Sequence, residues 1–196
     1  MHNSQISSIK SALDGALWLT SSLPIRLFGD PILHKPCDKI SDQEIADGLA
    51  EEWASELINF MRVYRDKFGF GRGLAANQIG ISKRIILVWL DSGPEIYINP
   101  EVVTTEGRGV YPESCISSAM LIIGEVTRPW AAKVRYTTLD GQQKVIEPDG
   151  AHCRLLLHEI DHLEGAVCSE KYNHGTIKIA SGKPEEILSP KLRRLE

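Results

Sequence analysis

The chain has 196 residues, of which 42% are hydrophobic and 24% charged, with a formal net charge of −4. This is the composition of one globular domain with a sizeable core. The acidic balance argues against a nucleic-acid-binding protein, and no apolar run reaches the ~20 residues that a membrane helix needs. The stretch 6–23 contains Lys10 and Asp14, so it lacks the apolar core of a secretory signal. We therefore expect a cytoplasmic protein with no direct nucleic-acid site and no membrane partner.

The chain is expected to have three parts. Residues 1–23 would form an N-terminal extension, residues 24–180 the main domain, and residues 181–196 a charged, loosely ordered tail that contains Pro184 and Pro190. We expect the protein to act as a monomer.

The first regular element in this domain is predicted to be a long helix. Ser41 and Glu44 have the spacing of a capping box. Apolar residues then recur every four positions, which indicates one amphipathic helix that ends near Gly69. These residues are Ile45, Leu49, Trp53, Leu57 and Met61. A glycine-rich turn, 69–73, follows.

The middle of the chain is predicted to be mostly strands. Residues 85–90 form an apolar, β-branched run typical of a buried strand, and 96–99 and 102–105 are predicted as two further short strands. Residues 134–138 and 145–146 flank an Asp140-Gly141 turn and predict a hairpin.

A second helix is predicted over 151–164, with Asp149 as its cap and Gly165 at its end. The order of elements predicts an α+β fold in which antiparallel sheets pack around one central helix.

This second helix contains an HExxH motif at His158, Glu159 and His162. At about 100° per residue, the two histidines lie some 40° apart and one turn along, so both imidazoles can face one ion. Glu159 lies beside them, where its carboxylate can accept a proton from a water molecule. The alternative is a solvated helix with two chance histidines, but the apolar neighbours of the motif favour a metal site.

A catalytic metal usually has three protein ligands, and the motif supplies two. If the protein were a zincin-like protease, the third ligand would lie C-terminal to the motif, at Glu164, Glu170 or His174. The other candidate is Cys115, about forty residues upstream. We interpret the remaining cysteines, Cys37, Cys153 and Cys168, as small buried apolar side chains, because they form no CxxC pair.

Three segments, in the same order, resemble the three motifs of the peptide deformylase family. Residues 71–78 (GRGLAANQ) are similar to GxGLAAxQ, residues 113–117 (ESCIS) to EGCLS, and residues 157–165 (LHEIDHLEG) to QHExDHLxG. Shorter similarities lie at 29–33, 98–100 and 128–129. The resemblance extends from about residue 24 to residue 165, and three motifs at the family's spacing do not arise by chance.

The resemblance implies a metal-dependent hydrolase that removes the N-formyl group from N-formylmethionyl peptides and releases formate. It implies that Cys115, His158 and His162 bind one divalent ion, typically ferrous iron, which zinc or nickel can replace. Mixed thiolate and imidazole ligands suit these metals. A formyl peptide is the implied partner, and association with the ribosome stays open.

The resemblance also implies roles for three other residues. Glu159 would act as the general acid and base. The Gln78 side chain and the backbone N–H of Ile116 would stabilise the charge that develops on the formyl oxygen.

Several positions depart from the family's pattern. Ser114 stands where the family has glycine, which carries a steric cost if φ there is positive, and Leu157 replaces the glutamine before the motif. Arg72 and Arg154 stand where the family prefers apolar residues that line the substrate pocket.

We expect the substrate-binding cleft to include Gly71, Arg72, Gly73 and Arg154. The two glycines would allow tight backbone geometry and close approach of the substrate. The arginines have two interpretations. Either they reach solvent or pair with an acid such as Glu113 or Asp149, or they bind a polar or acidic group of the substrate.

The sequence is compatible with four alternative functions. The first is a deformylase for formylmethionyl peptides, and the second is a deformylase with an altered, polar or acidic substrate preference through Arg154 and Arg72. The third is a zincin-like protease, which the upstream cysteine motif argues against. The fourth is a non-catalytic metal-binding relative, which needs neither Glu159 nor Gln78.

Overall fold

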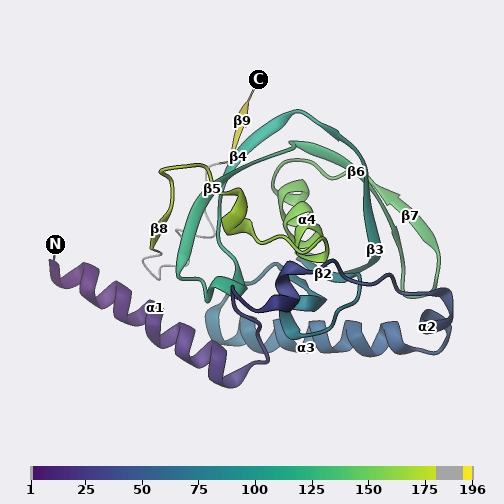
Figure 1. Ribbon diagram of the computed structural model, residues 1–196, viewed down its shortest axis with the longest axis horizontal. Helices are drawn as coiled ribbons and strands as arrows, with labels where there is room; N and C mark the ends of the chain where they lie inside the picture. The colour runs from purple at the N-terminus through teal and green to yellow at the C-terminus, as the bar shows by residue number, and fades with distance from the viewer. Residues whose placement is uncertain (1, 180–191, 196) are drawn as a thin grey trace.

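The computed structural model describes residues 2–179 and 192–195, which form two antiparallel sheets and four α-helices (Figure 1). The helices are α1 (His2–Ser22), α2 (Asp42–Ala46), α3 (Leu49–Phe68) and α4 (Gly150–Leu163). The strands are β1 (Gly73–Ala75), β2 (Ile85–Leu90), β3 (Gly93–Glu106), β4 (Arg108–Glu113), β5 (Ile122–Arg128), β6 (Ala131–Thr137), β7 (Gln143–Ile146), β8 (Lys178–Ile179) and β9 (Arg193–Leu195). Four short 3₁₀ helices complete these elements, η1 (Pro31–His34), η2 (Ala76–Ile79), η3 (Ile116–Ser118) and η4 (Cys168–Lys171).

The larger sheet has the strand order β1-β2-β3-β6-β7 and the smaller one β8-β5-β4-β9. Every neighbouring pair is antiparallel. In Figure 1, α4 lies inside the curve of the sheets and α3 lies outside it. The predicted α+β architecture around a central helix is confirmed.

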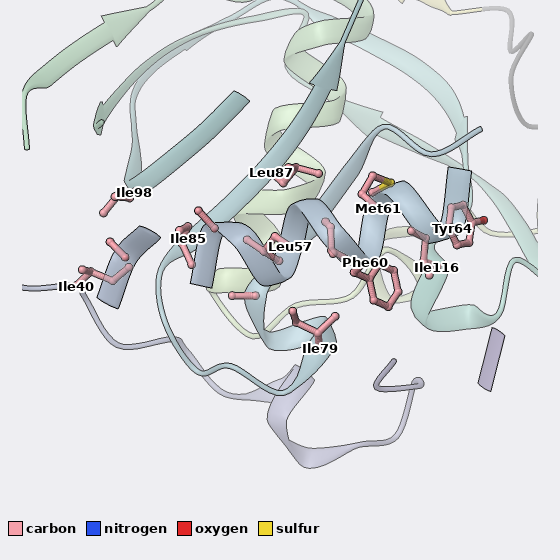
Figure 2. Close-up of a cluster of buried hydrophobic side chains, with 14 of the residues drawn as sticks. Ile40, Leu57, Phe60, Met61, Tyr64, Ile79, Ile85, Leu87, Ile98 and Ile116 are labelled. Atoms are coloured by element: carbon pink, nitrogen blue, oxygen red, sulfur yellow. The ribbon is translucent and has the colours of Figure 1, made fainter. Parts of the chain in front are cut away.

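Strand β2 is buried on both faces, which explains its unbroken apolar sequence. Ile85 and Leu87 pack with α3, as Figure 2 shows beside Leu57. Ile86 and Val88 point to the opposite face and pack with α4. Because side chains alternate along a strand, the apolar residues of β2 contribute to two hydrophobic cores, one with α3 and one with α4. The strand therefore lies between the two helices and sets their separation.

The prediction of one helix between residues 41 and 69 is wrong, because the chain forms two. The capping box is present: Glu44 N–H donates to Ser41 Oγ at 3.2 Å, and Ser41 N–H donates to Glu44 Oε2 at 2.8 Å. However, α2 ends at Ala46 and α3 begins after Gly48, whose φ of +80° breaks the helical backbone. An L-residue other than glycine would be strained in that conformation.

The two strands predicted at 96–99 and 102–105 are parts of the single strand β3. Its pairing with β6 shifts register between Ile98 and Glu101, and the skipped residues are Asn99, with a φ of +49°, and Pro100. Proline cannot donate to a sheet, so a bulge accommodates it without ending the strand. The predicted hairpin is confirmed as β6 and β7.

The N-terminal segment forms a helix, α1, which contacts the core at its C-terminal end. Leu19 is 1% exposed, and the rings of Trp18 and Phe68 meet edge to face at 5.4 Å. Residues 180–191 and 196 of the predicted tail lie outside the described residues. Residues 193–195 are not loosely ordered as predicted, because they form β9 and pair with β4. None of the helices described here has both the length and the apolar character that a membrane span requires.

Candidate metal centre and active site

The HExxH motif lies on α4, as predicted, and the helix carries it into the interior. His158, Glu159 and His162 are all buried. The surroundings come from β2 and β6 on one side and from the loop after β4 on the other. Asp149 occupies the N-cap position, although its side chain makes no capping hydrogen bond.

Three candidate ligand atoms converge at one point. Cys115 follows β4 at the start of η3, and its Sγ lies 3.2 Å from His162 Nε2. One donor atom from each of Cys115, His158 and His162 lies within 4.8 Å of the others. Ligands about 2.0–2.3 Å from a tetrahedral ion are about 3.5 Å from one another, so the three side chains fit a divalent metal.

Glu113 sets the orientation of one of these ligands. His158 Nδ1–H donates to Glu113 Oε2 at 2.8 Å, which leaves Nε2 free to face the ion. Arg128 binds the same carboxylate through Nε at 2.5 Å and Nη2 at 2.9 Å. Burial alone would raise the pKa of Glu113, but the charges of Arg128 and His158 hold that pKa far below its usual range. The carboxylate therefore stays ionised, in the position that supports a metal-bound histidine.

The second histidine is held by its backbone. Asn77 Nδ2 donates to the His162 carbonyl oxygen at 2.6 Å. Burial lowers the pKa of His162 well below its ordinary value. His162 is therefore a neutral imidazole, the form that ligates a metal.

The position of the Glu159 side chain depends on Gly73. A Cβ at Gly73 would overlap the Glu159 carboxylate, so this part of β1 must lack a side chain. Glu159 Oε2 is buried and has no hydrogen-bond partner among the described residues. Burial raises the pKa of Glu159 to about 7, against the opposing charges of His158 and Arg154. A carboxyl in this range can both accept and release a proton near neutral pH.

Gln78 points its amide group into the centre. Its Oε1 accepts from the Ala75 N–H at 2.8 Å, and its Nε2 donates to Ser117 Oγ at 3.0 Å and towards Cys115 Sγ at 3.3 Å. Gln78 is 1% exposed, so its amide belongs to the interior and not to the protein surface. Ile116 lines the same cavity, and its N–H donates to no acceptor found in the described part of the chain.

The centre opens into a cavity of about 100 Å³. Gly71, Arg72, Gly73 and Arg154 all line it, together with Tyr111. A Cβ at Gly71 would come within 2.7 Å of Met61 Sδ and 2.9 Å of Tyr64 Cδ1, and its φ is +138°. Gly71 is therefore required by backbone conformation and by packing.

Two expectations about the departures are corrected. Within the described residues, Arg154 forms no ion pair with Glu113 or Asp149, because Glu113 is bound by Arg128 and His158. Ser114 does not have a positive φ, so it carries no such strain, and its Oγ donates to the Ile122 carbonyl oxygen at 2.8 Å.

The alternative metal ligands do not reach the centre. Glu164 pairs with Arg84 at 2.8 Å, and Glu170 pairs with His34 at 3.2 Å. Neither residue, nor His174, belongs to the metal-ligating group found in the described residues.

Several supporting residues were not identified from the sequence. Glu113 was considered only as a partner for the two pocket arginines, and Arg128 only as part of a short similarity. Asn77 and Ser117 lie inside the segments that resemble the family motifs, and this position was the one sequence feature that could have identified them. Cys168 gave no signal: it is buried, as expected, and its thiol lies 3.3 Å from Tyr172 Oη beside Cys115.

Comparisons with known proteins agree with this geometry. Residues 22–177 match the family model described as polypeptide deformylase. A peptide deformylase of Thermoanaerobacter pseudethanolicus is 43% identical over 150 residues, which covers 75% of this chain and 87% of that protein. One from Caldanaerobacter subterraneus is 38% identical over the same shares. Among solved structures, the peptide deformylase of Thermotoga maritima superposes with a TM-score of 0.69 at 31% identity, covering 76% of this chain and 96% of that one.

Proposed function

The chain belongs to the peptide deformylase family, and on that premise we propose that Cys115, His158 and His162 hold the one divalent metal ion of a hydrolase that removes the N-formyl group from peptides. The convergence of these three donors, with His158 oriented by Glu113, carries the proposal. Ferrous iron is the proposed ion, with zinc or nickel as replacements, because thiolate and imidazole suit these metals. Such an ion, when bound, makes water more acidic and polarises the formyl group.

Glu159 is the proposed general base and acid. Its Oε2 has no protein partner, so it is available to a water molecule in the cavity. The carboxylate accepts a proton as the water attacks the formyl carbon, and it then passes the proton to the leaving amine. The pKa of about 7 that burial produces suits both steps.

Gln78 and Ile116 are the proposed hydrogen-bond donors to the formyl oxygen. The Gln78 amide is held by Ala75 on one side and by Ser117 on the other, so its direction is fixed before substrate arrives. Donors that are oriented in advance stabilise a developing oxyanion without reorganisation.

The setting of the reaction is also part of the proposal. We place it in the cytoplasm, on formylmethionyl chains at the ribosome, with the enzyme acting as a monomer. The match to the polypeptide deformylase family model supports the peptide substrate of this setting.

The test is formate release from formyl-Met-Ala by protein reconstituted anaerobically with ferrous iron. Glu159→Ala should lower kcat by roughly 10²–10⁴-fold while the protein keeps its metal. Glu164→Ala, an exposed position just after α4, serves as the control and should retain activity. Equal activity of the Glu159 variant would overturn the assignment. A Cys115→Ala protein that keeps its metal would instead favour a zincin-like protease.

A further inference from the structure

Two arginines reach the active-site cavity from different elements. Arg154 lies on α4, one turn before His158, and Arg72 lies at the rim, just before β1. Neither forms an ion pair with any residue in the ranges 2–179 and 192–195. Two acids line the same cavity and have other roles: Glu113 binds Arg128, and Glu159 is the proposed base.

The Arg154 guanidinium is held in place rather than free in solvent. Its Cζ lies 4.4 Å from the centre of the Tyr111 ring, which is a cation–π distance. Its Nε is buried and has no hydrogen-bond partner in the described part of the chain. Such a donor is costly to bury unless something pairs with it, which points to a group brought by the substrate.

Arg72 adds a second positive charge to the same wall. Arg72, Tyr111 and Arg154 all line the cavity, so the two guanidiniums face the same small space. Burial raises the pKa of Tyr111, and the charges of Arg154 and Arg72 oppose that rise. Two cations and a phenol around a small cavity form a recognition site for a carboxylate.

The position of Arg154 relative to the metal ligands sets where that carboxylate would lie. Arg154 precedes His158 by four positions on α4, an axial rise of about 6 Å between their Cα atoms, so the two side chains project from the same side of the helix. A carboxylate bound by Arg154 would therefore lie in the cavity that His158 and Cys115 also line.

We propose that Arg154, assisted by Arg72 and Tyr111, binds the side-chain carboxylate of an acidic N-formylated residue, so that the enzyme accepts formyl-Glu or formyl-Asp peptides at this cavity. This inference rests on the proposed deformylase function and names an additional substrate class for it. A charge-assisted hydrogen bond to a guanidinium distinguishes glutamate from glutamine, which has the same shape but no charge.

The test compares kcat/KM for formyl-Glu-Ala and formyl-Gln-Ala with the iron-loaded enzyme. The wild type should prefer the glutamate peptide by roughly tenfold or more, and Arg154→Gln should bring the ratio close to one. Arg72→Gln should reduce it to a smaller extent, because Arg72 is exposed. Arg62→Gln, an exposed arginine of α3 outside the cavity, is the matched control and should keep the wild-type ratio.

A wild-type ratio of one or less, or a ratio that Arg154→Gln leaves unchanged, would overturn the inference. If Arg154→Gln does not fold, the wild-type ratio and its decrease with added salt decide the question. If no formyl peptide releases formate, the proposed function fails. Calorimetric binding of N-acetyl-Glu-Ala against N-acetyl-Gln-Ala then tests the carboxylate site separately: tighter binding of the glutamate peptide supports it, and equal binding contradicts it.

Discussion

Glu113 shows how one buried carboxylate can bind two partners. It is 1% exposed and binds both His158 and Arg128, while Arg128 also binds Asp161 at 2.7 Å. A buried charge is stable only when it is paired and hydrogen-bonded, and here every partner is itself fixed. The network therefore orients His158 before a metal binds.

Glu113→Gln should weaken metal binding by roughly 10–100-fold, because the uncharged amide orients His158 less well and lowers its basicity. Competition with a chelator of known affinity measures this effect, after thermal unfolding has shown that the metal-free variant is folded. Glu101→Gln, which breaks an exposed ion pair with Arg135, is the control. A folded Glu113→Gln protein with wild-type metal affinity would refute the orienting role.

At the scale of elements, the junction of β1 and α4 places the catalytic carboxylate. Strand β1 pairs with β2 on one side, and its Gly73 lies against Glu159 of α4. Because glycine has no side chain, the helix can approach the strand closely enough for Glu159 to share the cavity with Gln78. The sequence pattern indicated that glycine is needed at position 73. It did not indicate that the space left by the missing side chain is filled by the Glu159 carboxylate.

Gly73→Ala should lower kcat for formyl-Met-Ala by roughly 10²-fold or more, since the new methyl group displaces the Glu159 carboxylate. The bound metal should stay at one equivalent, because the three heavy atoms nearest to a methyl group at residue 73 all belong to Glu159. Steady-state kinetics and metal analysis measure the two quantities. Gly15→Ala, in the regular helical backbone of α1 and outside the cavity, adds the same methyl group next to the Phe68 ring and should keep its activity. Full activity of Gly73→Ala would show that Glu159 tolerates the displacement.

At the scale of the whole molecule, α1 is an addition to the matched family region, which begins at residue 22. The helix docks near its C-terminal end, where Leu19 joins the same core as Leu57 and Tyr64 of α3. The opposite side of α1 is open, and Leu17 is 67% exposed. Leu19 therefore anchors the N-terminal segment to the catalytic unit.

Leu19→Ala should lower the free energy of unfolding by about 2–5 kcal/mol, the usual cost of a large-to-small change in a core. Leu17→Ala makes the same change two residues away on the exposed face and should stay within about 0.5 kcal/mol of the wild type. Urea denaturation of both variants measures the difference. Equal effects would mean that α1 is not docked through Leu19.

The sequence by itself determined what depends on spacing along one element. Helical periodicity brings His158 and His162 to one face, and the alternation of apolar residues predicts the β6–β7 hairpin. The motifs around Gln78 and Cys115 indicated the family and its chemistry. These features are local, because a helix or strand repeats with a fixed period whatever it packs against.

Tertiary structure alone decided which distant residues meet. Glu113 could have paired with Arg154, but in the fold the Arg128 side chain from β5 reaches it with two hydrogen bonds, and Arg154 is left to the cavity. The break at Gly48 and the bulge at Pro100 likewise depend on how α3 and β3 must fit their neighbours. Which residues form long-range contacts depends on all the charges and surfaces of the folded chain at once. The periodicity of a single helix or strand therefore does not predict these contacts.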